Sequence, residues 1–443
     1  MVKRLLVLLL FVQCTYAYGE TIKTDVVVVG NGASAVAAAI QSGRSKVKTL
    51  LLLNGPWLEE LSAQVMVTQN TKTYSPSGIW EELDKELRTF YKKTPGYDTL
   101  AKALRYEPYT AAATLKKMAD SVKMLTVKIS VNYTTIEKDD TGWKLVVVIN
   151  GEKVTVKAKV LIDGTENGDL ISKAGAVLPP DLHILLANPL PDLYRTAIAS
   201  GSYVSKQPET GTAYPPAPVY YVPLSAVVVP NTDNLLTINK KLFPDDRFDV
   251  NAKIALGQAV GATAAYCGFF KTTTKQLDVR AIQIELLDFK STLLYFHDIE
   301  GTDPFYRSIQ QIAAAGMLKG KYVPAGAEGG EGAFLFMPDL QVTTAEIKPV
   351  LTEVYTRAFL WLNKEHPGEN FTVGNLLSLI SEISLAEPDN FKISMQKLWK
   401  QEFKFTSDFD LNKPVTRREF AILANKYLNP FARAVNIHGK MVN

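Results

Sequence analysis

The chain has 443 residues, of which 47% are hydrophobic and 21% are charged. This is the composition of a globular protein long enough to form two or three domains with sizeable cores. Its 49 basic and 45 acidic side chains leave a formal charge of +4, which is too small to indicate a nucleic acid or another polyanionic partner.

The first 17 residues have the pattern of a signal peptide. Lys3 and Arg4 form a basic start, residues 5–12 a short apolar core, and residues 15–17 a small-residue cleavage site. The alternatives are a buried N-terminal helix and lipoprotein processing at Cys14, which lacks the small residue expected before it. We therefore expect an exported protein, periplasmic or extracellular.

Cleavage at that site would leave Cys267 as the one remaining cysteine, so no intramolecular disulfide is expected. Its apolar neighbours predict a buried thiol. The sequence shows no run long and apolar enough to span a bilayer. We expect a soluble mature protein with no transmembrane segment.

Residues 25–53, DVVVVGNGASAVAAAIQSGRSKVKTLLLL, predict a strand, a glycine turn, a helix and a second strand. The four consecutive valines are typical of a central parallel strand covered on both faces. The turn has the form G-x-G-x-x-A and consists of Gly30, Asn31, Gly32, Ala33, Ser34 and Ala35. In such a turn the first glycine permits the bend, the second admits a pyrophosphate, and the small third residue allows close helix packing. The helix N-terminus then faces the phosphates.

The second strand ends without the acidic residue that usually binds the ribose of a dinucleotide. The sequence there is Leu52-Leu53-Asn54-Gly55. Asn54 can hydrogen-bond a ribose hydroxyl, but a neutral amide accepts less strongly than a carboxylate. The pattern predicts a Rossmann-type unit with a weakened nucleotide site.

Helices are predicted at residues 79–91 and 110–123; the apolar face of the first is formed by Ile79, Leu83, Leu87 and Phe90. Alternation over residues 126–160 predicts a strand and a hairpin whose second turn is Asn150-Gly151.

A further parallel strand is predicted at residues 158–162, followed by the acidic, glycine-bearing segment 163–169. Open α/β sheets bind ligands at such loops. A solvated turn with a helix N-cap explains the same residues.

Residues 176–230 are rich in proline and predict the outer wall of a pocket. Its candidate lining residues are Tyr203, Tyr220 and Tyr221, although packed tyrosines are commoner than binding ones. A strand is expected at residues 234–239. Helices are expected at residues 254–270, 279–294 and 305–318.

Residues 338–443 predict a separate helical module. Its last helix begins with Thr416 as N-cap and Glu419 at the capping-box position, and it ends at Asn429-Pro430.

Several blocks, in their order along the chain, resemble exported bacterial FAD-dependent oxidoreductases with the glutathione-reductase-like flavin fold. Among them are DVVVVGNGASAVAAAIQSG, VLIDGTENGDLISKAG and GQAVGATAA, and together the blocks touch most of residues 22–320. The final PVTRREFAILANKYLNPF resembles the S-layer-homology-like tail of some members. The resemblance implies an α/β, Rossmann-type FAD/NAD(P)-binding fold with a parallel central sheet, a small β insert and a C-terminal helical module. The implied regions are a signal peptide at 1–17, an FAD-binding domain at 22–300 with a reduced substrate region at about 176–230, and an S-layer-homology-like region at 301–443.

The resemblance also assigns site residues. Gly30, Gly32 and Ala35 match the FAD pyrophosphate turn, and Tyr133 falls near the adenine. The second flavin-facing loop is matched by Asp163, Gly164 and Thr165, and the helix whose N-terminus points at the flavin ring by Gly257 and Gln258.

The sequence departs from this family at several positions. Leu53 aligns with the family's acidic ribose residue, and Glu59-Glu60 replace the Gly-Gly of its flavin-side loop. Two carboxylates there would repel a pyrophosphate unless they point away. The long substrate section that follows Gly175 in the family is missing, and residues 241–251 lack the family's Asn-Gly and Arg-x-x-Pro pattern.

Two functions are consistent with these patterns. The first is an FAD-dependent oxidoreductase acting on an unidentified small molecule, with catalytic residues unassigned. Arg195 and His183 are candidates for proton transfer, with a surface or structural role as the alternative. The second is a cofactor-free relative that keeps the scaffold as a binding or cell-surface protein. NAD binding alone explains fewer blocks. The four histidines show no metal-ligand spacing. If the protein contacts the cell envelope, we expect the C-terminal module to make that contact.

Overall fold

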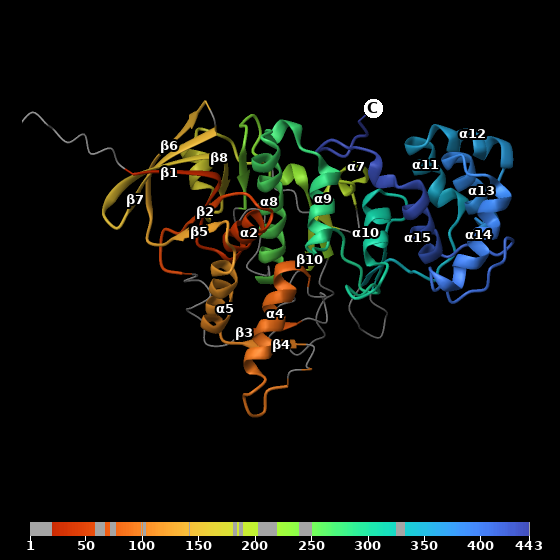
Figure 1. Ribbon diagram of the computed structural model, residues 1–443, viewed down its shortest axis with the longest axis horizontal. Helices are drawn as coiled ribbons and strands as arrows, with labels where there is room; N and C mark the ends of the chain where they lie inside the picture. The colour runs from red at the N-terminus through yellow and green to blue at the C-terminus, as the bar shows by residue number, and fades with distance from the viewer. Residues whose placement is uncertain are drawn as a thin grey trace, which may run out of the picture.

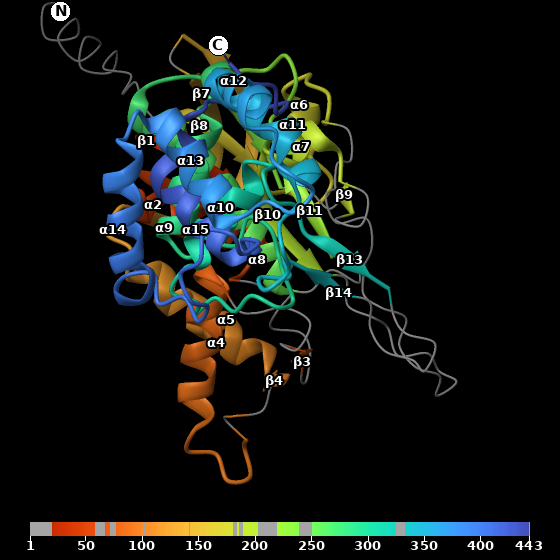
Figure 2. The same cartoon turned by 90° about the vertical axis from the view of Figure 1, so that its right-hand side faces the viewer.

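The computed structural model describes residues 20–57, 67–70, 77–98, 100, 103–140, 142–179, 184–185, 189–202, 219–238, 250–324 and 333–442. Figures 1 and 2 show that a sheet-containing part, which holds the N-terminal elements, adjoins a part made of helices at the C-terminal end.

A mainly parallel sheet forms the centre of the first part. Its parallel strands are β1 (Thr21–Val29), β2 (Thr49–Leu52), β5 (Leu125–Lys128), β8 (Glu152–Asp163) and β12 (Leu235–Thr237), in the order β5-β2-β1-β8-β12. The valines of β1 are at most 2% exposed, because separate hydrophobic cores cover the two faces of the sheet. The predicted α/β Rossmann-type fold is confirmed.

An antiparallel meander extends the same sheet. It consists of β6 (Asn132–Asp139) and β7 (Gly142–Ile149), followed by β8. Asn150 and Gly151 have φ angles of 53° and 86°, so the predicted hairpin turn is confirmed. The parallel strand predicted at residues 158–162 is confirmed, but it starts earlier than predicted, because the second strand of the hairpin continues into it as the 12-residue strand β8. One edge of β8 pairs first with β7 and then, at its carboxyl end, with β12.

Two helices of small residues cross in close contact beside the sheet. They are α2 (Ala33–Arg44) and α8 (Val250–Phe270). A Cβ atom on Gly257 would lie 2.1 Å from the Ser34 carbonyl oxygen, and one on Gly261 would lie 2.3 Å from that of Ala38. Only glycine allows the two backbones to approach this closely.

Other helices differ from the predicted bounds for local reasons. The helix predicted at 79–91 is α4 (Gly78–Tyr91), but Phe90 is 61% exposed and Tyr91 is buried in its place. The predicted helix 279–294 is α9 (Val279–Asp288), which ends before Lys290 with a φ of 58°. The helix predicted at 305–318 is α10 (Tyr306–Ala314), which stops before Gly316 with a φ of 80°.

The remaining elements of the first part are α5 (Pro108–Asp120), α6 (Asp169–Lys173), α7 (Pro191–Tyr194), β3 (Val67–Asn70), β4 (Ala103–Tyr106), β9 (Ile184–Leu185), β10 (Ala197–Ser202), β11 (Val219–Pro223), β13 (Lys321–Val323), β14 (Ala333–Leu335) and the 3₁₀ turns η1 (Leu224–Ala226) and η3 (Thr274–Gln276). Strands β10, β11 and β9 form a small antiparallel sheet that contacts α8.

The C-terminal part is helical, as predicted. It contains α11 (Thr344–Val354), α12 (Thr356–Glu365), α13 (Val373–Ser384), α14 (Pro388–Gln401), α15 (Arg417–Leu428) and the turn η4 (Pro430–Ala432). The segments before α11, α13 and α15 form a cycle of backbone hydrogen bonds. The Val342 N–H donates to Val415, that of Val415 to Phe371, and that of Phe371 to Val342. This cycle ties the starts of the three helices together.

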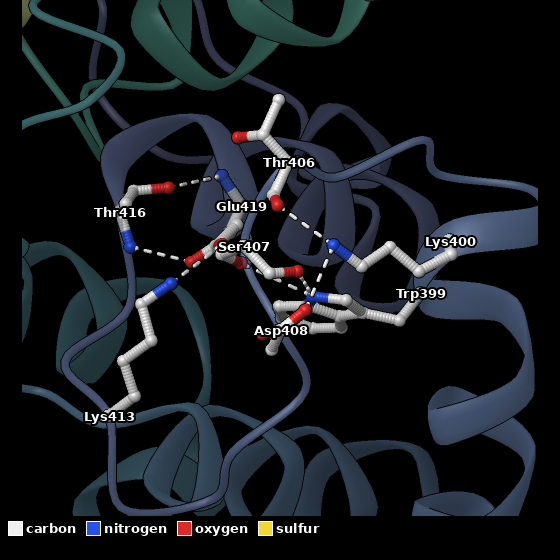
Figure 3. Close-up of polar contacts among 8 residues, drawn as sticks. All are labelled: Trp399, Lys400, Thr406, Ser407, Asp408, Lys413, Thr416 and Glu419. Carbon is white, nitrogen blue, oxygen red and sulfur yellow. Dashed lines mark hydrogen bonds and ion pairs between the residues drawn. The ribbon is translucent and has the colours of Figure 1, made fainter.

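The predicted start of the last helix is confirmed (Figure 3). The Thr416 hydroxyl accepts from the Glu419 N–H, and the Glu419 carboxylate accepts from the Thr416 N–H at 2.9 Å. Ser407 and Lys413 also contact this carboxylate, which is almost fully buried. Asn429 then ends the helix in a left-handed conformation.

The two parts are joined by buried arginines. Arg195 makes a bidentate ion pair with Glu353, and Arg280 donates to the Arg433 carbonyl and packs on Phe431. Arg417 has no exposed side-chain surface. It bonds to Glu346 on α11 and to two carbonyl groups, those of Lys319 and Phe336, that flank the pair β13–β14. The helical region is therefore docked on the rest of the chain, and the predicted boundary at residue 300 stays a prediction.

Candidate functional site

The glycine turn lies at the carboxyl edge of the parallel sheet, between β1 and α2. A Cβ atom on Gly30 would lie 2.2 Å from the Gly164 carbonyl oxygen, so only glycine fits there. The Gly164 N–H donates to the Val29 carbonyl at 2.8 Å, and that of Gly30 to Leu52 at 3.1 Å. The turn and the loop after β8, separated by more than a hundred residues, are thus held together.

Helix α2 starts without a side-chain cap. Gly32 is its N-cap residue, in extended conformation, and the first turn contains no acidic side chain. Ala33, Ser34 and Ala35 follow and are buried. A helix start of this kind carries positive potential, which favours an anion.

Asn31 connects this turn to the end of β2. Its Oδ1 atom accepts from the Asn54 backbone N–H at 2.9 Å. Asn54 is exposed, whereas Leu53, which occupies the position of the family's acidic residue, is fully buried in the core. The side chain at position 53 therefore faces away from solvent, and Asn54 is the first exposed residue after β2.

Tyr133 lies on β6, beside the same edge. The preceding Val131 N–H donates to the Leu53 carbonyl, which brings this segment over the end of β2. The Tyr133 hydroxyl lies 3.5 Å from Asp169 Oδ2, and Lys173 Nζ lies 5.9 Å from the ring centre. Burial, followed by the charges of Asp169 and Asp163, raises the pKa of Tyr133, so the phenol stays neutral.

The loop after β8 is organised by the carboxylate of Asp163. This side chain accepts from the Thr165 N–H at 2.9 Å, the Thr165 hydroxyl at 2.6 Å and the Ile171 N–H at 2.9 Å. Burial raises the pKa of Asp163, and these hydrogen bonds oppose the rise. The Thr165 hydroxyl accepts from the Asp169 N–H at the start of α6. Both side chains thus shape the loop from inside it, and they are buried, so the loop is not the solvated turn of the alternative interpretation; the N-cap residue of α6 is Gly168.

Gly257 and Gln258 lie two turns inside α8, which begins at Val250, one turn before the start predicted at residue 254. Gly257 packs on the first turn of α2. Gln258 Oε1 accepts from the Ile79 N–H, and its Nε2 donates to Gln41 Oε1, both at 3.0 Å. This amide therefore ties α8 to α4 and α2.

The other candidates have structural partners or lie outside the described residues. Tyr220 and Tyr221 are buried in β11, and the Tyr221 hydroxyl accepts from the Leu190 N–H at 3.2 Å. Arg195 is held by Glu353. Tyr203, His183 and Glu59-Glu60 fall outside the described residues. In the part of the chain that the structure covers, no group of three His, Cys, Asp or Glu side chains is placed to hold a metal ion, and no helix is long and apolar enough to cross a membrane.

Sequence reasoning did not find the link between Asn31 and Asn54. The two residues are 23 positions apart, and a hydrogen bond from a turn side chain to the end of a neighbouring strand leaves no periodic signal. The structure thus brings together Gly30, Asn31, Gly32, Asn54, Gly164 and Gly257 at one edge of the sheet.

This fold and this glycine turn define a Rossmann-type α/β domain. Residues 25–178 match the family described as FAD dependent oxidoreductase. The matched segment runs from β1 through α6 and contains both the glycine turn and the loop after β8. That part of the chain is similar to FAD-dependent oxidoreductases; the remainder lies outside the match.

No curated protein matches the chain. Among solved structures, p-nitrophenol 4-monooxygenase from Pseudomonas putida is 14% identical over 37% of this chain and 46% of its own, with a TM-score of 0.28. Anhydrotetracycline hydroxylase from Streptomyces rimosus is 14% identical over 66% of this chain and 69% of its own, with a TM-score of 0.35. A geranylgeranyl bacteriochlorophyll reductase-like protein from Thermoplasma acidophilum is 12% identical over 78% of this chain and 99% of its own, with a TM-score of 0.35. The chain thus spans less than half the length of the monooxygenase.

Proposed function

We propose that the protein binds FAD and is an FAD-dependent oxidoreductase acting on a small-molecule substrate. The observation that carries the proposal is the family match over residues 25–178, together with a glycine turn that opens a helix without a side-chain cap or an acidic residue. An anion at that helix start is favoured by the helix dipole.

The residues at this edge fit the diphosphate half of FAD. Backbone N–H groups of residues 32–35 would hold the pyrophosphate, Asn54 the ribose, and the segment around Tyr133 the adenine. The backbone of Asp163 to Thr165 would lie on the flavin side. When bound, FAD supplies the hydride chemistry, while the protein orients it and excludes water. No residue is assigned to proton transfer.

The experiment is the visible absorbance spectrum of the mature protein from Tyr18 onward, recorded after incubation with excess FAD and gel filtration. A flavin spectrum that travels with the protein is the expected result. A folded, colourless protein that takes up no FAD would refute the proposal.

A second function, a cofactor-free relative that serves as a binding or cell-surface protein, is favoured by specific observations. Leu53 is buried where the family has its ribose carboxylate, and the side-chain groups of Asp163 and Gln258 are engaged within the protein. The same spectrum distinguishes the two functions.

We also propose export and contact with the cell envelope through the helical region. Export is supported by the basic and apolar pattern of the first 17 residues. N-terminal sequencing of protein recovered from the cell exterior tests it, with Tyr18 as the expected first residue.

Envelope contact would use a surface other than that of Arg417, which is buried against the Lys319 and Phe336 carbonyls. Retention of the purified protein on isolated cell walls tests this contact, and passage of the whole sample through the walls unbound would refute it.

A further inference from the structure

The end of helix α8 exposes two adjacent aromatic side chains. Phe269 and Phe270 are 57% and 60% exposed, although most of this helix is buried. Their rings lie 5.1 Å apart, edge to face, and the ring of Tyr266 packs on that of Phe270 at 4.8 Å. Single exposed apolar residues are ordinary in proteins, whereas exposed rings in contact with each other indicate a surface that meets another apolar phase.

This end of α8 lies at the amino edge of the parallel sheet, opposite to the glycine turn. A Cβ atom on Gly268 would lie 3.4 Å from Asp25 Cβ and 3.5 Å from Val47 Cγ1. The Lys48 N–H donates to the Asp25 carboxylate, and the Asp25 N–H donates to the Lys48 carbonyl, both at 3.0 Å. The beginnings of β1 and β2 and the end of α8 therefore form one surface.

Four exposed lysines lie on this surface: Lys23 on β1, Lys46 and Lys48 before β2, and Lys271 after α8. Within the part of the chain that the structure describes, none of their ammonium groups has an ion-pair partner. The neighbouring carboxylates are engaged elsewhere, since Asp25 pairs with Lys159 at 2.7 Å and Asp278 accepts from the Ala281 N–H. The two aromatic rings are thus accompanied by an excess of positive charge.

The backbone at two of these lysines would suit glycine better. Lys46 and Lys271 have φ angles of 66° and 53°, in the left-handed region that glycine adopts at least cost after a helix. The negative ends of the α2 and α8 dipoles favour a cation at these two positions. Lys23 and Lys48 lie at the beginnings of strands, where no helix dipole explains them. Their charges fit an anion outside the protein.

We propose that this amino-edge surface, formed by the four lysines together with Phe269 and Phe270, binds an anionic lipid membrane. The two rings would enter the interfacial layer, and the ammonium groups would lie among the phosphate headgroups. Aromatic rings accompanied by lysines are favoured at a membrane interface.

The size of the apolar part favours lipid over a protein partner. A stable protein interface buries roughly 800 Å² on each partner, which two side chains at a helix end do not supply. Binding to a lipid surface requires only that side chains insert, and each lysine then adds electrostatic attraction. In this orientation the glycine turn, at the opposite edge of the sheet, faces away from the membrane and stays open to solvent.

The test is sedimentation of the mature protein with lipid vesicles. Vesicles of equal parts phosphatidylcholine and phosphatidylglycerol should carry the protein down, vesicles of phosphatidylcholine alone should not, and added salt should release it. Lys23→Gln/Lys48→Gln should bind about 25-fold more weakly, because each lysine near an anionic surface contributes about fivefold. Phe269→Ser/Phe270→Ser should bind about tenfold more weakly, because the inserted apolar area is lost.

Matched controls come from the helical region. Lys348→Gln/Lys397→Gln removes two exposed lysines, and Phe359→Ser/Leu360→Ser removes two apolar side chains that are 55% and 59% exposed. Both controls should bind the anionic vesicles as the unsubstituted protein does. Equal melting temperatures for all variants would show that each lost affinity comes from the surface and not from unfolding.

Four outcomes would overturn the proposal. They are no binding to the anionic vesicles, equal binding to the neutral ones, unchanged binding by both amino-edge variants, and an equal loss in the controls. Binding to soluble polyglutamate in place of vesicles would also overturn it, and would assign an acidic polypeptide as the partner. The assay needs no flavin, so each of these outcomes leaves the proposed FAD binding untouched.

Discussion

The close crossing of α2 and α8 can be tested with a single methyl group. A Cβ atom on Gly257 would lie 2.1 Å from the Ser34 carbonyl oxygen, and backbone atoms cannot turn aside as a side chain can. To reach even 3.0 Å the two helices must separate by roughly 0.9 Å, which breaks packing along the whole contact. Overpacking of this kind costs about 1–3 kcal/mol, more than the roughly 1 kcal/mol that alanine gains over glycine in a helix. Gly257→Ala should therefore be destabilised.

Gly268, in the same helix, provides the matched control. A Cβ atom there would meet the Asp25 Cβ atom at 3.4 Å, an ordinary contact. Gly268→Ala should be neutral or more stable by up to about 1 kcal/mol. Urea unfolding of both variants measures the difference. Equal stability of the two variants would refute the packing argument. Because Ser34 lies in the first turn of α2, Gly257→Ala should also weaken FAD binding, whereas Gly268→Ala should not.

Four further predictions follow from named contacts. Gly32→Val should lose bound FAD, because a side chain would stand where the backbone meets phosphate; full flavin content by absorbance would contradict the assignment of the turn. Arg417→Ala leaves a carboxylate and two carbonyls without their partner and should cost about 3–5 kcal/mol by urea unfolding, whereas Arg307→Ala, which removes an exposed pair, should cost less than about 1 kcal/mol. The hydrogen bond from Arg195 lowers the pKa of Glu353. The stability that this ion pair contributes is therefore present above the pKa of the unfolded state and is lost as the pH falls through the pKa of the folded state. Glu353→Gln should accordingly show a flatter decline in melting temperature between about pH 6 and about pH 3. Burial raises the pKa of Cys267 to about 12, so thiol reagents should label it in urea but not in buffer, as mass spectrometry would show.

Local patterns predicted most of the architecture. The unbroken valines of β1, the Asn-Gly turn and the capping box of α15 each report on neighbouring residues, and each is confirmed. Helix ends were less predictable, because residues such as Lys290 and Gly316 adopt positive φ angles within segments whose apolar pattern continues.

The candidate site was predicted in part. The G-x-G-x-x-A spacing located the tight turn between β1 and α2, since the requirement for glycine is local. The helix that contains Gly257 and Gln258 was predicted to begin at residue 254, whereas α8 begins one turn earlier, at Val250. The cofactor, the substrate and the export signal stay predictions.

The sequence by itself determined most of the strands and helices and the place of the tight glycine turn between β1 and α2, because those properties depend on residues a few positions apart. Only the tertiary structure decided which face each polar side chain meets. Leu53 enters the core, Asn31 accepts from Asn54, Gln258 joins three helices, and Arg195 pairs with Glu353. Such partners are tens or hundreds of residues apart in the sequence. The hydrophobic periodicity of a helix or strand indicates which of its faces is buried, but it does not indicate which residues that face contacts.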